Sequence, residues 1–149
     1  MSRRALLDVS VLIALFDAGH VHHEIAHDWF EDHRTLGWAT CPLTENGFVR
    51  VLSQVVSGGE ITPVPELVDR LRRFCSSGHH EFWPDSVSWL DEAMFDAARA
   101  RSHRQLTDVY LLGLAVKRGG CLVTFDQRIP LGAVKGARGD SIIVLAPEV

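Results

Sequence analysis

Four acidic residues occupy positions from which they can act together on one ion or substrate. Asp8 and Asp126 each directly follow a short apolar run that we predict to be a buried strand. Asp108 and Glu45 lie in the first turns of two predicted helices. In an open parallel sheet, ligands bind beyond the carboxyl ends of the strands, where the N-termini of the following helices also lie. We therefore expect the four carboxylates to converge at that edge.

Carboxylates crowded in this way need a cation between them. Two like charges about 4 Å apart repel by about 1 kcal/mol in water and by about 4 kcal/mol at the effective dielectric of a protein edge. Three or four such groups would raise one another's pKa values and weaken the fold without a cation. Oxygen-only ligands select hard ions, so we expect Mg²⁺, with Mn²⁺ as the alternative. One or two such ions can activate a water and stabilise a leaving oxygen, which predicts phosphodiester hydrolysis.

Each acid also has a purely structural explanation when it is taken alone. Asp8 and Asp126 can cap helices or turns, and Asp108 and Glu45 can complement helix dipoles. The mutual repulsion of all four, if they meet, is what favours a metal site over these separate roles.

A competing metal motif, H-E-x-x-H, is formed by His23, Glu24 and His27. On a helix this spacing puts two imidazoles one turn apart, where they can bind zinc with the glutamate as the general base of a protease. A zinc protease also needs a third ligand on a following element, and no downstream residue has suitable spacing. With eight histidines in the chain a chance match is easily reached, so this alternative ranks last.

Basic residues gather close to the third and fourth acids. Arg99, Arg101, His103 and Arg104 precede the third acid, and Arg128 follows the fourth. A solvated helix end is the plainer explanation of the first group. In the functional interpretation, His103, Arg104 and Arg128 contact the phosphates of a nucleic acid next to the metal site.

Short apolar strands that alternate with amphipathic helices must position these residues. The predicted strands are residues 5–7, 37–40, 81–83, 121–125 and 142–145. The predicted helices are residues 9–16, 22–33, 43–56, 66–77, 88–100 and 107–120. Ser88 and Thr107 are candidate N-caps, and Gly58 and Gly119 are candidate helix ends. This alternation predicts an α/β fold, a three-layer α/β/α sandwich with a mostly parallel central sheet.

The composition is that of one globular domain spanning residues 1–149. Of the 149 residues 46% are hydrophobic, and three widely spaced cysteines suggest neither disulfides nor a cysteine zinc site. A net charge of −4 argues against a surface that binds nucleic acid everywhere, so a polyanion must be met locally. No apolar run approaches the ~18 residues that span a bilayer, so we expect a soluble, cytoplasmic protein that does not bind membranes.

Four stretches of the chain resemble, in order and spacing, the four acidic motifs of PIN-domain proteins, in particular the VapC ribonuclease toxins of toxin–antitoxin pairs. They are LLDVSVLIALF, PLTENGFVRVLSQ, LTDVYLLGLAVKRGG and LVTFDQR. The resemblance implies a PIN-like fold in which Asp8, Glu45, Asp108 and Asp126 are the metal-binding catalytic acids and Ser10 is a supporting polar residue. It also implies Mg²⁺-dependent endoribonuclease activity, homodimers, and inhibition by a small cognate antitoxin.

A non-catalytic alternative would keep the same fold. In that interpretation the chain is a PIN-like module that binds RNA or a protein partner through a vestigial site. The presence of all four acids favours retained chemistry over this alternative.

Overall fold

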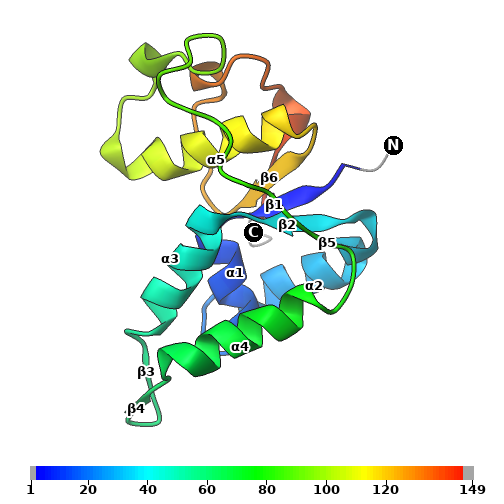
Figure 1. Ribbon diagram of the computed structural model, residues 1–149, viewed down its shortest axis with the longest axis vertical. Helices are drawn as coiled ribbons and strands as arrows, with labels where there is room; N and C mark the ends of the chain where they lie inside the picture. Colours follow the sequence, from blue (N-terminus) through cyan, green and yellow to red (C-terminus); the bar gives the residue numbers. More distant parts are fainter. Residues whose placement is uncertain (1–2, 146–149) are drawn as a thin grey trace.

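The central element of the protein is a sheet of five parallel strands (Figure 1). The computed structural model describes residues 3–145, except for the side chain of Ser57. The strands are β1 (Ala5–Leu7), β2 (Trp38–Thr40), β5 (His80–Phe82), β6 (Cys121–Thr124) and β7 (Ile142–Val144). Their order is β5-β2-β1-β6-β7, and every pairing is parallel. This arrangement confirms the predicted fold class.

Helices cover both faces of the sheet, which explains why its central strands are apolar except for the threonines at the ends of β2 and β6. One face carries α1 (Val9–Phe16), α2 (His23–His33), α3 (Pro42–Leu52) and α4 (Val64–Cys75), and the other carries α5 (Leu106–Lys117) (Figure 1). Leu7 faces the first core and Leu6 the second, as the alternation of side chains along a strand requires. Residues 3–145 also contain five 3₁₀ turns: Arg34–Leu36, Ala97–Arg99, His103–Gln105, Leu131–Ala133 and Gly139–Ser141.

The helix that carries the third acid begins one residue earlier than predicted. The N-cap of α5 is Gln105, without a side-chain capping bond, so the prediction that Thr107 caps this helix was wrong. Asp108 lies in the first turn as expected. At the other end, Gly119 has a φ of +70°, a left-handed conformation that glycine adopts without strain and that stops the helix.

The helix predicted over residues 88–100 is absent: this segment contains only the 3₁₀ turn Ala97–Arg99. Its backbone groups bond elsewhere. The amide of Asp96 donates to the carbonyl of Ala133 (2.9 Å), and Phe95 forms a bridge with Val134. The apolar residues of this segment do have helical spacing. Its backbone groups, however, form hydrogen bonds with the distant segment 133–135 in place of the bonds of a helix.

The helix predicted over residues 43–56 is shorter than expected, because α3 ends at Leu52. A two-stranded hairpin follows, formed by β3 (Val56–Ser57) and β4 (Glu60–Ile61). Gly58 and Gly59 make its turn with φ values of +61° and +82°, and two positive φ angles suit the tight turn of a hairpin. Within residues 3–145 no helix is long and apolar enough to cross a membrane.

Candidate active site

Asp8 is a buried acid held by several hydrogen bonds. It is the N-cap of α1, and its Oδ1 accepts a hydrogen bond from the amide of Val11 (2.8 Å). The amide of Ser10 and the hydroxyl of Thr124 also bond to its carboxyl group. The side chain is almost fully enclosed, with 4% of the residue exposed, and this burial raises the pKa of Asp8 to about 6 against the opposing effect of the hydrogen bonds.

Asp126 follows β6, the strand next to β1, and is also fixed by local bonds. Its Oδ1 accepts from the amide of Arg128 (2.8 Å), and its own amide donates to the hydroxyl oxygen of Thr124 (3.1 Å). Thr124 therefore contacts both acids. The sequence analysis missed this residue, although it is a polar side chain at the end of an otherwise apolar strand, two positions before Asp126.

The third acid, Asp108, lies in the first turn of α5, the helix on the opposite face of the sheet from α1, and it interacts with Asp8 and Asp126. Its pKa is raised to about 7, first by burial and then by the charges of Asp8 and Asp126. The carboxyl of Asp126 also hydrogen-bonds to it, which favours the protonated form of Asp108. The structure therefore brings together three of the four predicted acids.

Glu45 is in the first turn of α3, as predicted, but its carboxylate has a different neighbour. Its Oε2 accepts a hydrogen bond from the hydroxyl of Thr40 (2.7 Å), and a ring nitrogen of His80 lies 2.8 Å from that same hydroxyl. The charges that raise the pKa values of Asp8 and Asp108 come from the other aspartates and do not include Glu45. In this conformation the Glu45 carboxylate bonds to Thr40 and not to any of the three aspartates.

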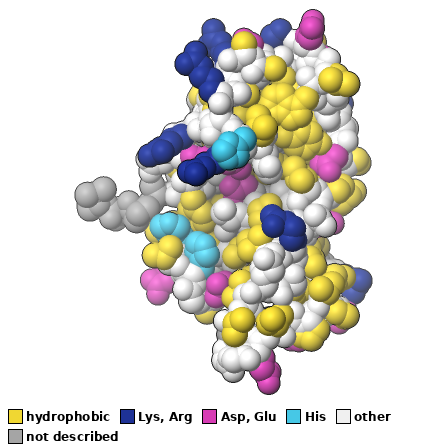
Figure 2. All heavy atoms as spheres, turned by 90° about the vertical axis from the view of Figure 1, so that its left-hand side faces the viewer, with side chains coloured by type: hydrophobic (Ala, Val, Ile, Leu, Met, Phe, Trp, Pro, Cys, Tyr) yellow, Lys and Arg dark blue, Asp and Glu magenta, His cyan; other side chains and the backbone are white. Residues whose placement is uncertain are grey.

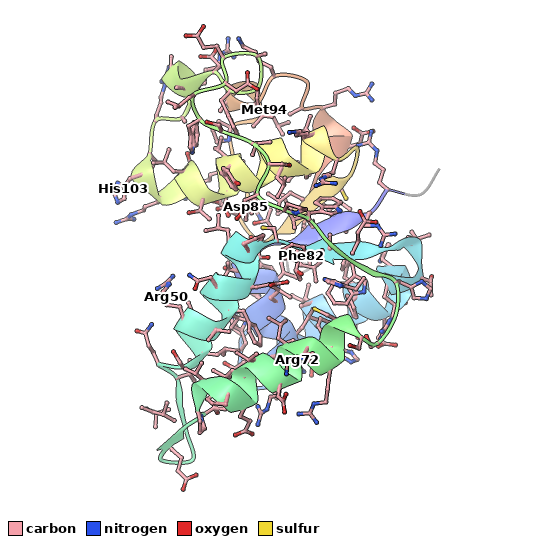
Figure 3. All side chains as sticks on the ribbon, in the orientation of Figure 1. Arg50, Arg72, Phe82, Asp85, Met94 and His103 are labelled. Atoms are coloured by element: carbon pink, nitrogen blue, oxygen red, sulfur yellow. The ribbon has the colours of Figure 1, made fainter. Side chains whose placement is uncertain are left out.

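The face toward which the strands point carries acidic side chains near its centre, with basic and histidine side chains gathered beside them (Figure 2). His103 lies at the N-terminal end of α5 and Arg50 projects from α3 on the same side (Figure 3). The predicted substrate-binding residues Ser10, His103, Arg104 and Arg128 are all exposed, and Ser10 reaches Asp8 through its backbone amide.

A basic groove of about 550 Å³ lies beside the start of α5. Arg99, Arg101 and Gln105 line it together with Pro130 and Gly132. Gln105 also ties the two basic segments together, because its Nε2 donates to the carbonyl of Arg128 (2.6 Å). The sequence analysis did not single out Gln105. Its contact with Arg128 joins segments far apart in the chain, so no local sequence pattern could predict it.

The H-E-x-x-H stretch does not form a metal site in this structure. The Nδ1 atom of His23 lies 2.6 Å from the carbonyl oxygen of Ala14, and the rings of His23 and His27 are 6.0 Å apart. In the described part of the chain, the three residues whose ligand atoms lie within 4.8 Å of one another are Glu45, Cys75 and His80, and neither histidine of the motif is among them. Nothing here supports the zinc-protease alternative.

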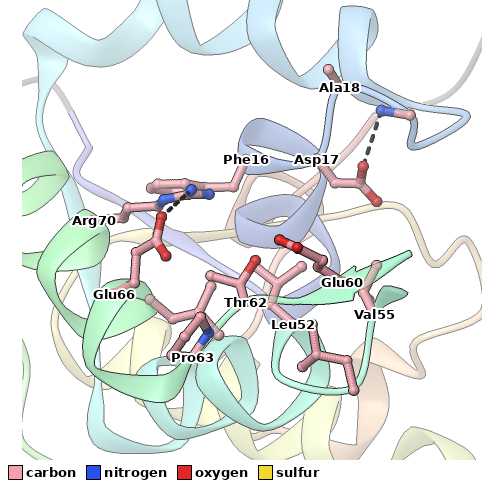
Figure 4. Close-up of a pocket in the computed structure, with 13 residues that line it drawn as sticks. Phe16, Asp17, Ala18, Leu52, Val55, Glu60, Thr62, Pro63, Glu66 and Arg70 are labelled. Carbon is pink, nitrogen blue, oxygen red and sulfur yellow. Dashed lines mark hydrogen bonds and ion pairs between the residues drawn. The ribbon is translucent and has the colours of Figure 1, made fainter. Parts of the chain in front are cut away.

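Another pocket, of about 430 Å³, lies between the end of α1, the hairpin and the start of α4 (Figure 4). Three of its charged groups bond within the protein: Arg70 pairs with Glu66 (2.6 Å), and Asp17 accepts from the amide of Gly19 (3.0 Å). None of the four candidate acids lines this pocket. This pocket is therefore separate from the candidate site at the edge of the sheet.

Comparison with known proteins identifies the family of this chain. The PIN domain model matches residues 5–134. Ribonuclease VapC44 of Mycobacterium tuberculosis is 48% identical over 142 residues, which cover 95% of this chain and 99% of that protein. Ribonuclease VapC39 of the same organism is 41% identical over 133 residues (89% and 95%), and Ribonuclease VapC38 is 45% identical over 128 residues (84% and 86%). The chain belongs to the PIN-domain family, with VapC ribonucleases as its relatives.

Proposed function

We propose that the chain is a single-domain endoribonuclease that requires a divalent cation and hydrolyses phosphodiester bonds of RNA. The observation that carries the proposal is the electrostatic coupling of the three aspartates: the charge of Asp126 raises the pKa of Asp8, and the charges of Asp8 and Asp126 raise that of Asp108, so ionisation of these two groups is unfavourable without a cation. The names of the relatives supply the substrate class, since all of them are ribonucleases. We propose Mg²⁺ as the ion, with Mn²⁺ as the alternative.

The three aspartates fit a hard divalent cation. They offer only oxygen atoms, and the raised pKa values of Asp8 and Asp108 identify a place where positive charge is favourable. Asp8, Asp108 and Asp126 would hold the ion, and Glu45 would join them after its side chain turns away from Thr40. A bound cation supplies electrostatic stabilisation for the charge that develops on the phosphate oxygens.

The protein's own contribution is to hold these acids in a fixed arrangement. Asp8 and Asp126 are oriented by backbone amides and share contacts with Thr124, so they need not reorganise during the reaction. Within residues 3–145 no backbone amide bonds to Asp108. Asp108 is therefore the acid best able to turn toward a water molecule and orient it for attack on phosphorus.

The substrate would be attracted locally, because the net charge of the chain is −4. Arg99 and Arg101 line a groove beside the acids, and exposed basic residues lie on both segments that Gln105 joins. We assign His103, Arg104 and Arg128, together with this groove, to contacts with RNA phosphates.

The family also suggests a biological role. We propose that the protein acts in the cytoplasm as the toxin of a toxin–antitoxin pair, as a homodimer, and that a small cognate antitoxin inhibits it. Expression of the chain is then expected to arrest growth, and Asp8→Asn is expected to relieve the arrest at equal soluble yield.

Cleavage of RNA by the purified chain in Mg²⁺, in Mn²⁺ and in excess EDTA tests the activity. We expect cleavage with either ion and none in EDTA, and a loss of about 100-fold or more in rate for Asp8→Asn and Asp108→Asn. Asp69→Asn is the matched control, because Asp69 is an exposed aspartate that pairs with Arg72 on α4. Cleavage that persists in EDTA would contradict the metal requirement. RNA binding without turnover at any divalent ion would identify the non-catalytic module instead.

A further inference from the structure

A second group of metal-binding side chains lies on the α3–α4 side of the sheet. Glu45, Cys75 and His80 each offer one ligand atom, and these atoms all lie within 4.8 Å of one another. They come from three elements, the first turn of α3, the last residue of α4 and the first residue of β5. All three residues are partly buried, so the cluster is held by the fold and remains within reach of solvent.

Thr40 orients two members of this cluster toward one point. Its hydroxyl donates to Glu45 Oε2 (2.7 Å), and His80 Nε2 lies 2.8 Å from the hydroxyl oxygen of Thr40. Burial raises the pKa of the Cys75 thiol, whereas the hydroxyl of Thr40 lowers it. The three ligand atoms therefore lie close together before any ion arrives, which lowers the cost of assembling a site, and an ion would replace the Thr40 hydroxyl as the partner of Glu45 and His80.

The donor set selects a different ion from the one that the aspartates select. Thiolate sulfur, imidazole nitrogen and a carboxylate oxygen are ligands of Zn²⁺, whereas Mg²⁺ prefers oxygen alone. In a tetrahedral zinc site the ligand atoms lie about 2.0–2.3 Å from the ion and hence about 3.3–3.8 Å from one another. Side-chain movements of about 1 Å would bring the three ligand atoms to these distances from one another. Three protein ligands leave the fourth position to water.

We propose that Glu45, Cys75 and His80 bind Zn²⁺, and that binding holds Glu45 away from the three aspartates and so inhibits the enzyme. When the zinc–sulfur bond forms, the thiol of Cys75 releases its proton to water. The proposed binding of Zn²⁺ is supported by the geometry of the cluster and does not depend on the proposed function. The inhibition rests on the proposed function, in which Glu45 must leave Thr40 to complete the acidic site.

The binding step is tested with the full-length chain and Co²⁺ as a spectroscopic probe for Zn²⁺. We expect a thiolate-to-cobalt charge-transfer band that Zn²⁺ abolishes. Cys75→Ala should remove the band, and His80→Ala should weaken Zn²⁺ affinity by more than about 100-fold, since loss of outer-shell partners alone costs about 10–100-fold. Cys121→Ala and His79→Asn are the matched controls, and circular dichroism checks that each variant is folded. A folded wild-type chain without the band would overturn the proposal.

The inhibition step is tested by RNA cleavage in Mg²⁺ with added Zn²⁺. We expect the wild type to lose activity, while Cys75→Ala and His80→Ala retain it at the same Zn²⁺ concentration. Equal inhibition of wild type and both variants would show that zinc acts at the aspartates and would overturn this part. If the wild type cleaves no RNA under any condition, the proposed function fails, whereas the cobalt spectrum still decides the binding site.

Discussion

At the scale of single residues, the three aspartates differ in what holds them. Asp8 combines burial with bonds from neutral donors, which partly offset the cost of its charge. Asp108 has no such bonds among the described residues, and it also faces the charges of Asp8 and Asp126. Its carboxyl group is therefore the one whose ionisation weakens the metal-free fold most, a cost that a cation would remove.

We predict that Asp108→Asn stabilises the metal-free protein at high pH. Because the pKa of Asp108 rises from 3.8 in the unfolded chain to about 7 in the fold, the folded state binds more protons across this interval. The free energy of unfolding must then fall as pH rises from about 4 to 7, and it stays low above that range. Asn carries no charge, so we expect it to raise this free energy by about 1–3 kcal/mol at pH 8.

Urea unfolding in EDTA at pH 4 and pH 8 measures this difference. The gain should be present at pH 8 and disappear at pH 4, where Asp108 is protonated in the fold. Asp69→Asn, an exposed carboxylate on α4, should show no comparable gain. The same gain at both pH values would mean that charge at position 108 is not the cause.

At the scale of elements, local patterns were enough for the five strands of the central sheet and for most of α5, but not for the hairpin β3–β4. Apolar runs followed by a polar residue predicted β1 and β6, and the parallel topology then implied that Asp8, Glu45, Asp108 and Asp126 would meet, although the Glu45 carboxylate bonds to Thr40 instead. The segment 88–100 could not be predicted, because its conformation depends on pairing with residues far along the chain.

The orientation of Glu45 was beyond the sequence for a similar reason. Its position in the first turn of α3 follows from Pro42 and the apolar spacing of that helix. Its rotamer depends on Thr40 and His80, which only the sheet brings beside it. Sequence spacing can thus place a side chain at an edge, while the partner that it contacts there is decided by tertiary structure.

We predict that Gly113→Ala destabilises the protein although alanine favours helices. A Cβ atom at Gly113 in α5 would lie 2.5 Å from Cζ of Phe95, whose ring stacks on Trp89. Displacing this buried ring is expected to lower the free energy of unfolding by about 1–3 kcal/mol, which exceeds the gain of about 1 kcal/mol in helix propensity. Thermal unfolding measures the change. Gly139→Ala is the control, because a Cβ there meets nothing within 4 Å, and a neutral or stabilising Gly113→Ala would refute the packing argument.

At the scale of the whole molecule, an acidic protein is proposed to bind a polyanion. The net charge of −4 repels RNA at long range, so binding depends on the basic residues that gather beside the acids. Arg101 lines the groove next to α5, whereas Arg73 is an equally charged, exposed residue in the last turn of α4. The two arginines therefore separate a local contact from an effect of overall charge.

We predict that Arg101→Ala weakens RNA binding and lowers its salt dependence, while Arg73→Ala changes neither. Each phosphate contact on single-stranded nucleic acid contributes about 0.7 to the slope of log K against log salt concentration, so losing one contact should reduce the slope by about that amount. Binding is measured with the Asp8→Asn chain, so that cleavage does not interfere, over a series of salt concentrations. If both arginine variants lowered affinity equally, the attraction would be a property of net charge, and the groove beside α5 would have no specific part in holding RNA.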